Sequence, residues 1–168
     1  MTQDKRYFTI SFIFILFLSF SVFFNSKPRD TSSVIQTILE EGNNIALKDT
    51  HPVISIFTTH NEFDAFYSRI HINKRPAPSL PEIDFTESAI LFISYGEQKT
   101  AGYSIDVRSV FKRNGTLIVK AVLISPPLDA FAAQVITNPY VLLTVPAGDY
   151  SRIELRNDIG EVLDFKNL

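Results

Sequence analysis

The sequence has no cysteine and no tryptophan among its 168 residues. Without cysteine it can form no disulfide, no thiol nucleophile and no thiolate metal site. Its formal net charge of −2 leaves no basic surplus, so we do not expect nucleic acid as a partner. Since disulfides and thiolate metals are excluded, stability must come from packing, and the 15 phenylalanines indicate an aromatic and aliphatic core.

Recognisable catalytic and metal-binding motifs are also lacking. The three histidines have no common metal-ligand spacing: His51, His60 and His71. Three carboxylates precede an apolar run without the ligand order of a calcium loop: Glu82, Asp84 and Glu87. The segment from Gly102 to Ser104 lacks the second glycine of a nucleophile elbow. We therefore expect no enzymatic activity, no metal and no cofactor.

The longest apolar run lies near the N-terminus, from Tyr7 to Phe24, after Lys5 and Arg6. As a helix it would span roughly 27 Å, close to the hydrocarbon thickness of a membrane. We favour an uncleaved anchor over a cleaved signal peptide, for which Ser19-Phe-Ser21 would be the cleavage site. Either alternative predicts two parts, an anchor or signal segment with its tether at residues 1–30 and an extracytoplasmic domain at residues 31–168.

The remaining chain has mainly strand character. Runs with strand composition are Val34–Leu39, Pro52–Phe57, Ala89–Ile93, Tyr140–Val145, Arg152–Arg156 and Val162–Phe165. The run from Ala89 to Ile93 is unbroken and short, which is typical of a strand covered on both faces. The segment 130–137 fits a helix or a strand equally well. We expect an α+β domain, mainly an antiparallel sheet with one short amphipathic helix packed on it, preceded by the N-terminal hydrophobic helix.

The predicted helix begins after Thr59, which forms a capping-box pattern with Glu62. Apolar residues then recur at helical spacing: Phe63, Phe66, Tyr67 and Ile70. This spacing gives the helix one aromatic face, with which it can cover a sheet.

Asn114-Gly115 predicts a two-residue hairpin turn, because both central positions of a type I′ turn need positive φ. Such a turn places Arg113 opposite Thr116 and fixes the register of the flanking strands. The expected facing pairs on one face are Phe111 with Ile118, Ser109 with Lys120, Val107 with Val122, and Ile105 with Ile124. The opposite face also carries apolar residues, among them Leu117 and Val119, so we expect both faces to be partly covered.

The loop from Gly96 to Gly102 is polar and longer than a hairpin needs. Recognition residues are often carried by such loops on a rigid scaffold. The alternative is that both glycines serve only the backbone at the strand ends.

Several motifs together resemble the C-terminal domain of the PrcB proteins. They are Gly96-x-x-x-Thr-Ala-Gly-Tyr-Ser-Ile105, the preceding Pro81-x-Ile-Asp-Phe85, Pro126-Pro127, and Gln134-x-x-Thr-x-Pro-Tyr140. The resemblance extends over residues 34–145. Ala101 stands where members of the family usually have a glycine, which would strain the loop if that position requires positive φ.

The resemblance implies a non-enzymatic exported or membrane-anchored subunit in the bacterial cell envelope that binds and stabilises a secreted or surface protease. The candidate partner-binding residues are Lys99, Thr100, Ala101, Gly102 and Tyr103. A second interpretation is direct inhibition, because Thr-x-Gly-Tyr at residues 100–103 is similar to the inhibitory loop of chagasin-type cysteine protease inhibitors. An enzyme with an unrecognised site is a third.

The N-terminal alternatives predict different masses for the mature protein. An uncleaved anchor keeps the chain in the membrane fraction at its full-length mass, whereas cleavage after Ser21 removes most of the apolar run. Intact-mass spectrometry of the protein from each cell fraction distinguishes the two. A shortened chain in the soluble fraction would contradict the anchor.

Overall fold

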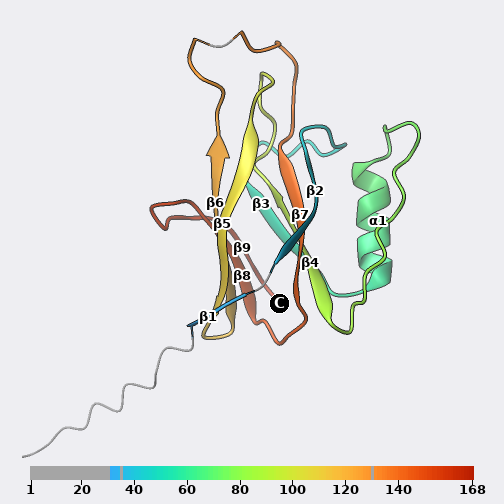
Figure 1. Cartoon of the computed structure of the whole chain (residues 1–168), viewed down its shortest axis with the longest axis vertical. Coiled ribbons are helices and arrows are strands. Elements are labelled where there is room, and N and C mark those ends of the chain that lie inside the picture. The colour runs from blue at the N-terminus through green and yellow to red at the C-terminus, as the bar shows by residue number, and fades with distance from the viewer. Residues whose placement is uncertain (1–30, 35, 130) are drawn as a thin grey trace, which may run out of the picture.

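The computed structural model describes residues 31–34, 36–129 and 131–168 and shows nine strands and one helix among them (Figure 1). The elements are β1 Thr31–Ser33, β2 Thr37–Gly42, β3 Val53–Phe57, α1 His60–Ile70, β4 Ser88–Ser94, β5 Ser104–Arg113, β6 Thr116–Ile124, β7 Tyr140–Pro146, β8 Arg152–Arg156 and β9 Val162–Asn167. The predicted anchor or signal Tyr7–Phe24 lies outside the described residues. In the part that is described, no helix has the length and apolarity needed to cross a membrane.

The strands form two sheets. One has the order β1-β5-β6-β8-β9 and is called sheet A below, and the other has the order β2-β7-β4-β3 and is called sheet B. Every pairing is antiparallel except that of β6 with β8, which is parallel. The predicted mainly antiparallel β domain with one short helix is therefore confirmed, with the strands divided between two sheets.

The two central strands of sheet B separate two apolar cores. Alternate residues of β4 and β7, such as Leu91 and Leu143, pack between the sheets, and the intervening ones, such as Phe92 and Leu142, pack beneath α1. All four of these side chains are at most 1 % exposed. The unbroken apolar sequence of β4 follows from this burial on both faces, as predicted.

The helix α1 covers the outer face of sheet B, on the side away from sheet A (Figure 1). Thr59 caps it, because its side-chain oxygen accepts a hydrogen bond from the backbone N–H of Glu62 at 3.4 Å. The predicted aromatic face is buried, comprising Phe63, Phe66, Tyr67 and Ile70. Sheet A, sheet B and the helix thus form three successive layers.

The β5–β6 hairpin keeps its predicted register only near the turn. Asn114 and Gly115 both have positive φ, at 51° and 78°. The predicted pairs from Arg113–Thr116 to Ser109–Lys120 are confirmed, but a β-bulge at Arg108 then shifts the register by one. Val107 consequently lies opposite Ala121 and Ile105 lies opposite Leu123, which corrects the two remaining pairs.

The bulge also changes which side chains of β5 face the core. Before it Ile105 and Val107 pack between the sheets, and after it Val110 does. On β6 the core residues are Leu117, Val119 and Ala121, so the face expected to be secondary is the inner one. One extra residue is enough to do this, since side chains alternate with a period of two.

Two other segments differ from their sequence patterns. Of the described residues in the predicted strand Val34–Leu39, only Thr37–Leu39 are in a strand, as the first part of β2 in sheet B, while β1 in sheet A ends before them at Ser33. The described residues of segment 130–137 form neither a helix nor a strand, and Thr137 makes an isolated bridge to Gln98.

Side chains of β9 close the gap to the edge of β3. Asp164 Oδ2 accepts a hydrogen bond from the backbone N–H of Ile54 at 2.8 Å, and Lys166 Nζ donates to Ser55 Oγ at 2.7 Å. An edge peptide group that is satisfied in this way no longer attracts a strand of another molecule. This pair joins the two sheets at one side of the molecule.

Replacing Gly115 should destabilise the fold. A Cβ there would lie 3.0 Å from Ser151 Oγ in a left-handed backbone conformation, so we expect Gly115→Ala to lower the free energy of unfolding by about 1–2 kcal/mol in urea denaturation. The matched control is Gly148→Ala, where a Cβ has ordinary contacts at 3.6 Å and the backbone needs no positive φ. Equal effects of the two variants would contradict the argument.

Candidate partner-binding surface

The predicted recognition loop connects β4 to β5 at one end of the two sheets (Figure 1). Lys99 and Gly102 are exposed, while Thr100, Ala101 and Tyr103 are half-buried. The structure therefore places all five candidate residues at least partly on the surface.

The loop is hydrogen-bonded to the segment that precedes β7. Gln98 and Thr137 exchange backbone hydrogen bonds at 2.7 and 2.9 Å. Ala101 N donates to Ala133 O at 2.9 Å, and Thr137 Oγ1 donates to the carbonyl of Thr100 at 2.9 Å. Residues 96–103, 126–129 and 131–137 thus form one surface, which we call the double loop.

Gly102 is the position between residues 99 and 103 that requires a glycine. Its φ is +97°, and a Cβ at this position would lie 2.9 Å from Pro126 Cβ. Among the described residues Asn114 alone has positive φ without being a glycine, so Ala101 carries no strain of this kind. The replacement of a family glycine by Ala101 therefore leaves the loop geometry unstrained.

The double loop displays apolar side chains to solvent. Leu128 and Phe131 have relative exposures of 109 % and 110 %, and Val135 and Ile136 are also exposed. Beside them a shallow pocket is lined by Gly102, Pro126, Pro127 and other small or apolar residues. Sequence reasoning noted the two prolines but missed these side chains, because nothing in the pattern distinguishes an exposed Phe from a buried one.

The base of the double loop is held by a buried polar network. Asn138 is 3 % exposed, accepts a hydrogen bond from Ser94 Oγ at 2.6 Å and donates to the carbonyl of Leu47 at 2.9 Å. Ser94 Oγ also accepts from the backbone N–H of Gly96 at 3.0 Å. Buried polar groups with partners of this kind fix one geometry, so the loop begins and ends on a defined frame.

A second polar cluster surrounds Glu40 on β2, between α1 and sheet B. Its carboxylate accepts hydrogen bonds from the hydroxyls of Tyr67, at 2.9 Å, and Tyr140. His71 Nε2 lies 3.2 Å from Glu40 Oε1, and Lys74 Nζ donates to the same oxygen at 3.2 Å. These contacts fasten the end of α1 to β2 and β7.

Burial and hydrogen bonding set the protonation states in this Glu40 cluster. Burial lowers the pKa of His71 below its ordinary value of 6.5, which the Glu40 charge opposes only in part. Burial raises the pKa of Glu40, but hydrogen bonds from Tyr140 and Tyr67 outweigh it and hold this pKa below 4.5. Burial, with Glu40 second, raises the pKa of Tyr67 to about 12. At neutral pH the carboxylate is charged and the imidazole is neutral.

Sequence reasoning did not find the Glu40 cluster. Tyr67 and His71 are four residues apart and share a helix face, but Glu40 and Tyr140 come from strands 100 residues apart. No local pattern joins them. The other two histidines, His51 and His60, lie outside the cluster, and no group of three or more His, Cys, Asp or Glu that could hold a metal occurs in the described part of the chain.

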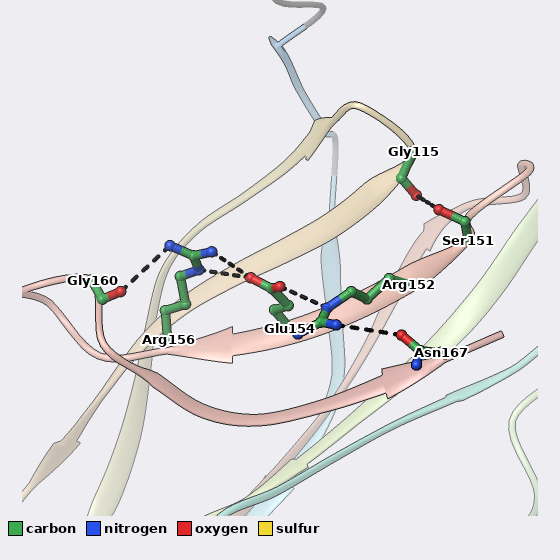
Figure 2. A network of polar contacts seen from close by, with 7 residues as sticks. All are labelled: Gly115, Ser151, Arg152, Glu154, Arg156, Gly160 and Asn167. Atoms are coloured by element: carbon green, nitrogen blue, oxygen red, sulfur yellow. Dashed lines mark hydrogen bonds and ion pairs between the residues drawn. The ribbon is translucent and has the colours of Figure 1, made fainter.

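A third polar cluster lies on β8 and ties it to the turn before β9 (Figure 2). Glu154, 7 % exposed, accepts from Arg152 Nε at 2.7 Å and from Arg156 Nε at 2.9 Å. Arg156 also donates to the carbonyl of Gly160 at 3.4 Å. These contacts hold the hairpin of β8 and β9, the two strands that the sequence predicted at Arg152–Arg156 and Val162–Phe165.

The Glu40 cluster predicts a loss of stability in acid. Both Glu40 and His71 bind protons less readily in the folded chain than in the unfolded one, so stability falls as the pH drops below 6.5 and falls further below 4.5. Thermal unfolding between pH 7.5 and 4 measures this. We expect His71→Gln to flatten the slope between pH 6.5 and 5. The control is the exposed His51→Gln, and an equal flattening there would contradict the assignment.

Comparisons with known proteins assign part of the chain to a family. No curated protein and no solved structure matches it. The family model of the PrcB C-terminal domain matches residues 89–146, from β4 to β7 and including the double loop. Residues 34–88, over which the resemblance was also expected to extend, lie outside this match. The match over residues 89–146 confirms the resemblance to the PrcB C-terminal domain that the Gly-Tyr and Pro-Tyr motifs predicted.

Proposed function

We propose that this protein is a non-enzymatic accessory subunit that binds and stabilises another polypeptide, a protease or another protein of the bacterial cell envelope. Residues 7–24 anchor it in the membrane or direct its export, and the domain acts outside the cytoplasm. The family match supports the association with a protease. The contact surface is the double loop, with Lys99 to Tyr103 along one side.

The observation that carries this proposal is the exposure of Leu128 and Phe131. Burying such a side chain is worth about 1.5–3 kcal/mol, yet both are fully exposed at the end of the molecule. Clustered exposed apolar residues with polar neighbours mark protein interfaces. Asp129, next to Leu128 in the chain, and Lys99, in the other segment of the double loop, are exposed and supply polar groups at its surface.

The rigidity of the base supports the same proposal. The Asn138 network and the hydrogen bonds between the two segments hold the backbone before any partner arrives. A preorganised loop loses less conformational entropy on binding, which increases affinity. A partner therefore meets apolar side chains on a fixed frame.

The Glu40 cluster supports a role in structure over one in catalysis. The carboxylate already accepts hydrogen bonds from both tyrosines and Lys74, so it is not free to take a proton from a substrate. The cluster joins the end of α1 to β2 and β7, so attachment of the helix is enough to explain these polar groups.

The proposal predicts that charge at the double loop abolishes partner binding. The full-length protein, tagged at the C-terminus, is crosslinked in cells and purified from the envelope fraction. We expect Phe131→Asp and Leu128→Asp to reduce the amount of co-purified protease at least about tenfold, since each places a charge in a desolvated contact. Lys99→Ala with Thr100→Ala should weaken capture less.

The control is Ile159→Asp, which changes an exposed apolar residue in the turn between β8 and β9. It should leave capture unchanged, and all variants should unfold at the temperature of the parent protein. A captured protease that remains active supports the accessory role, whereas one that is silenced supports the inhibitor. Undiminished capture by Phe131→Asp would refute the assigned surface.

A further inference from the structure

On the side of β1 and β2, the chain passes directly from sheet A to sheet B. β1 pairs with β5 at three positions, of which the last joins Ser33 to Phe111. Val34 N then donates to Val110 O at 3.0 Å, and the chain crosses to sheet B as β2. After this crossing the chain pairs with β7 of sheet B and no longer with β5 of sheet A.

The divergence leaves one edge of β5 without a strand. Among the described residues β1 pairs with Phe111–Arg113 alone, so Ser104–Val107 has a strand partner only on the β6 side. The bulge at Arg108 marks the end of this regular run. Alternate residues of an edge strand direct their N–H and C=O groups away from the sheet. The free edge is therefore about four residues long.

The inner face of β2 is correspondingly uncovered. Ile38 lies opposite Leu143, whose side chain is fully buried between the sheets. Ile38 shares that face but remains 51 % exposed. Glu41 lies opposite the buried Val141 and is also exposed. In the described part of the chain, these two inward positions of β2 are therefore open to solvent.

A pocket lies between these two edges. Its lining includes Gly42 and Asn43 from the end of β2, Ser104 and Ile105 from β5, and Val141 from β7. Glu41 is the one charged residue of this lining. We call the region between the free edge of β5 and the inner face of β2 the slot.

We propose that the slot binds an extended segment of a partner polypeptide, which adds to sheet A along Ser104–Val107 as a short extra strand. The proposal rests on the protein-binding role proposed above and identifies a second contact with the same partner. The slot begins directly after Tyr103, the last residue of the first segment of the double loop, so one partner can contact both.

The chemistry of the slot defines the segment that fits it. Unpaired peptide groups on a strand edge are satisfied by another extended backbone at about 4.8 Å. Side chains that alternate along this backbone would place apolar groups over Ile38 and Ile105. A lysine or arginine at one end would meet Glu41. The expected segment has alternating apolar residues and one basic residue.

Synthetic peptides test the chemistry of the slot on the full-length protein, purified in detergent. The first is a capped seven-residue peptide of alternating valine and threonine with a terminal lysine. The second carries N-methyl groups on alternate backbone nitrogens, and the third has glutamate in place of lysine. We expect the first to bind with a Kd below about 1 mM, and the other two to bind at least about tenfold more weakly.

Hydrogen exchange locates the bound peptide. With the first peptide, backbone amides within Ser104–Val107 should exchange at least about fivefold more slowly, because an added strand accepts hydrogen bonds from them. Ile38→Asp should abolish binding, and Glu41→Lys should reverse the preference between lysine and glutamate. Ile159→Asp serves again as the control. Equal binding of the N-methylated peptide, no binding at 1 mM, or protection elsewhere would overturn the proposal.

The proposals for the slot and for the double loop can be refuted independently of each other. If Phe131→Asp abolishes partner capture in cells and Ile38→Asp leaves it unchanged, the slot proposal is wrong and the accessory role stands. If the peptide binds the slot while Phe131→Asp leaves capture unchanged, the double loop is wrong as the contact surface. A dimer of the purified full-length protein that Ile38→Asp dissociates would mean that a second copy occupies the slot, which overturns the proposed partner segment.

Discussion

The burial of β4 and β7 on both faces is the constraint on which the rest of this structure depends. Each strand contributes alternate side chains to the core between the sheets and to the core beneath α1. A shift of either strand by one residue would exchange the two sets. The positions of sheet A, of the helix and of the loops at the ends of these strands follow from this single register.

The double loop depends on that register. It leaves β4 after Ser94 and returns to β7 through Asn138, and these two residues hydrogen-bond to each other. The family motifs fall on this frame: Thr100 and Thr137 connect the segments, Gly102 supplies the left-handed turn, and Tyr140 reaches Glu40 on the far side of sheet B. Thr100, Gly102 and Thr137, which belong to the motifs that resemble the PrcB family, thus build the surface that we assign to partner binding.

The sequence predicted those features whose causes are local. The capping pattern of Thr59 and the turn at Asn114-Gly115 each depend on a few neighbouring residues, and the structure confirms both. The bulge at Arg108 was not predictable, because it adjusts which side chains of β5 pack against the other sheet, and that packing is not visible in the local sequence. The Glu40 cluster was missed for the same reason: its members meet only after strands distant in the chain have paired.

The parallel pairing of β6 with β8 has a consequence for the order of assembly. Between these strands the chain must leave sheet A, form β7 at the centre of the other sheet and return. Until residues 152–167 have been synthesised and have paired, one edge of β6 has no partner strand. Partly folded chains with an unpaired strand edge are prone to aggregation. Pairings between segments so distant in sequence form slowly. A delay in the synthesis of this last portion would therefore prolong the state in which the edge of β6 is unpaired and prone to aggregation.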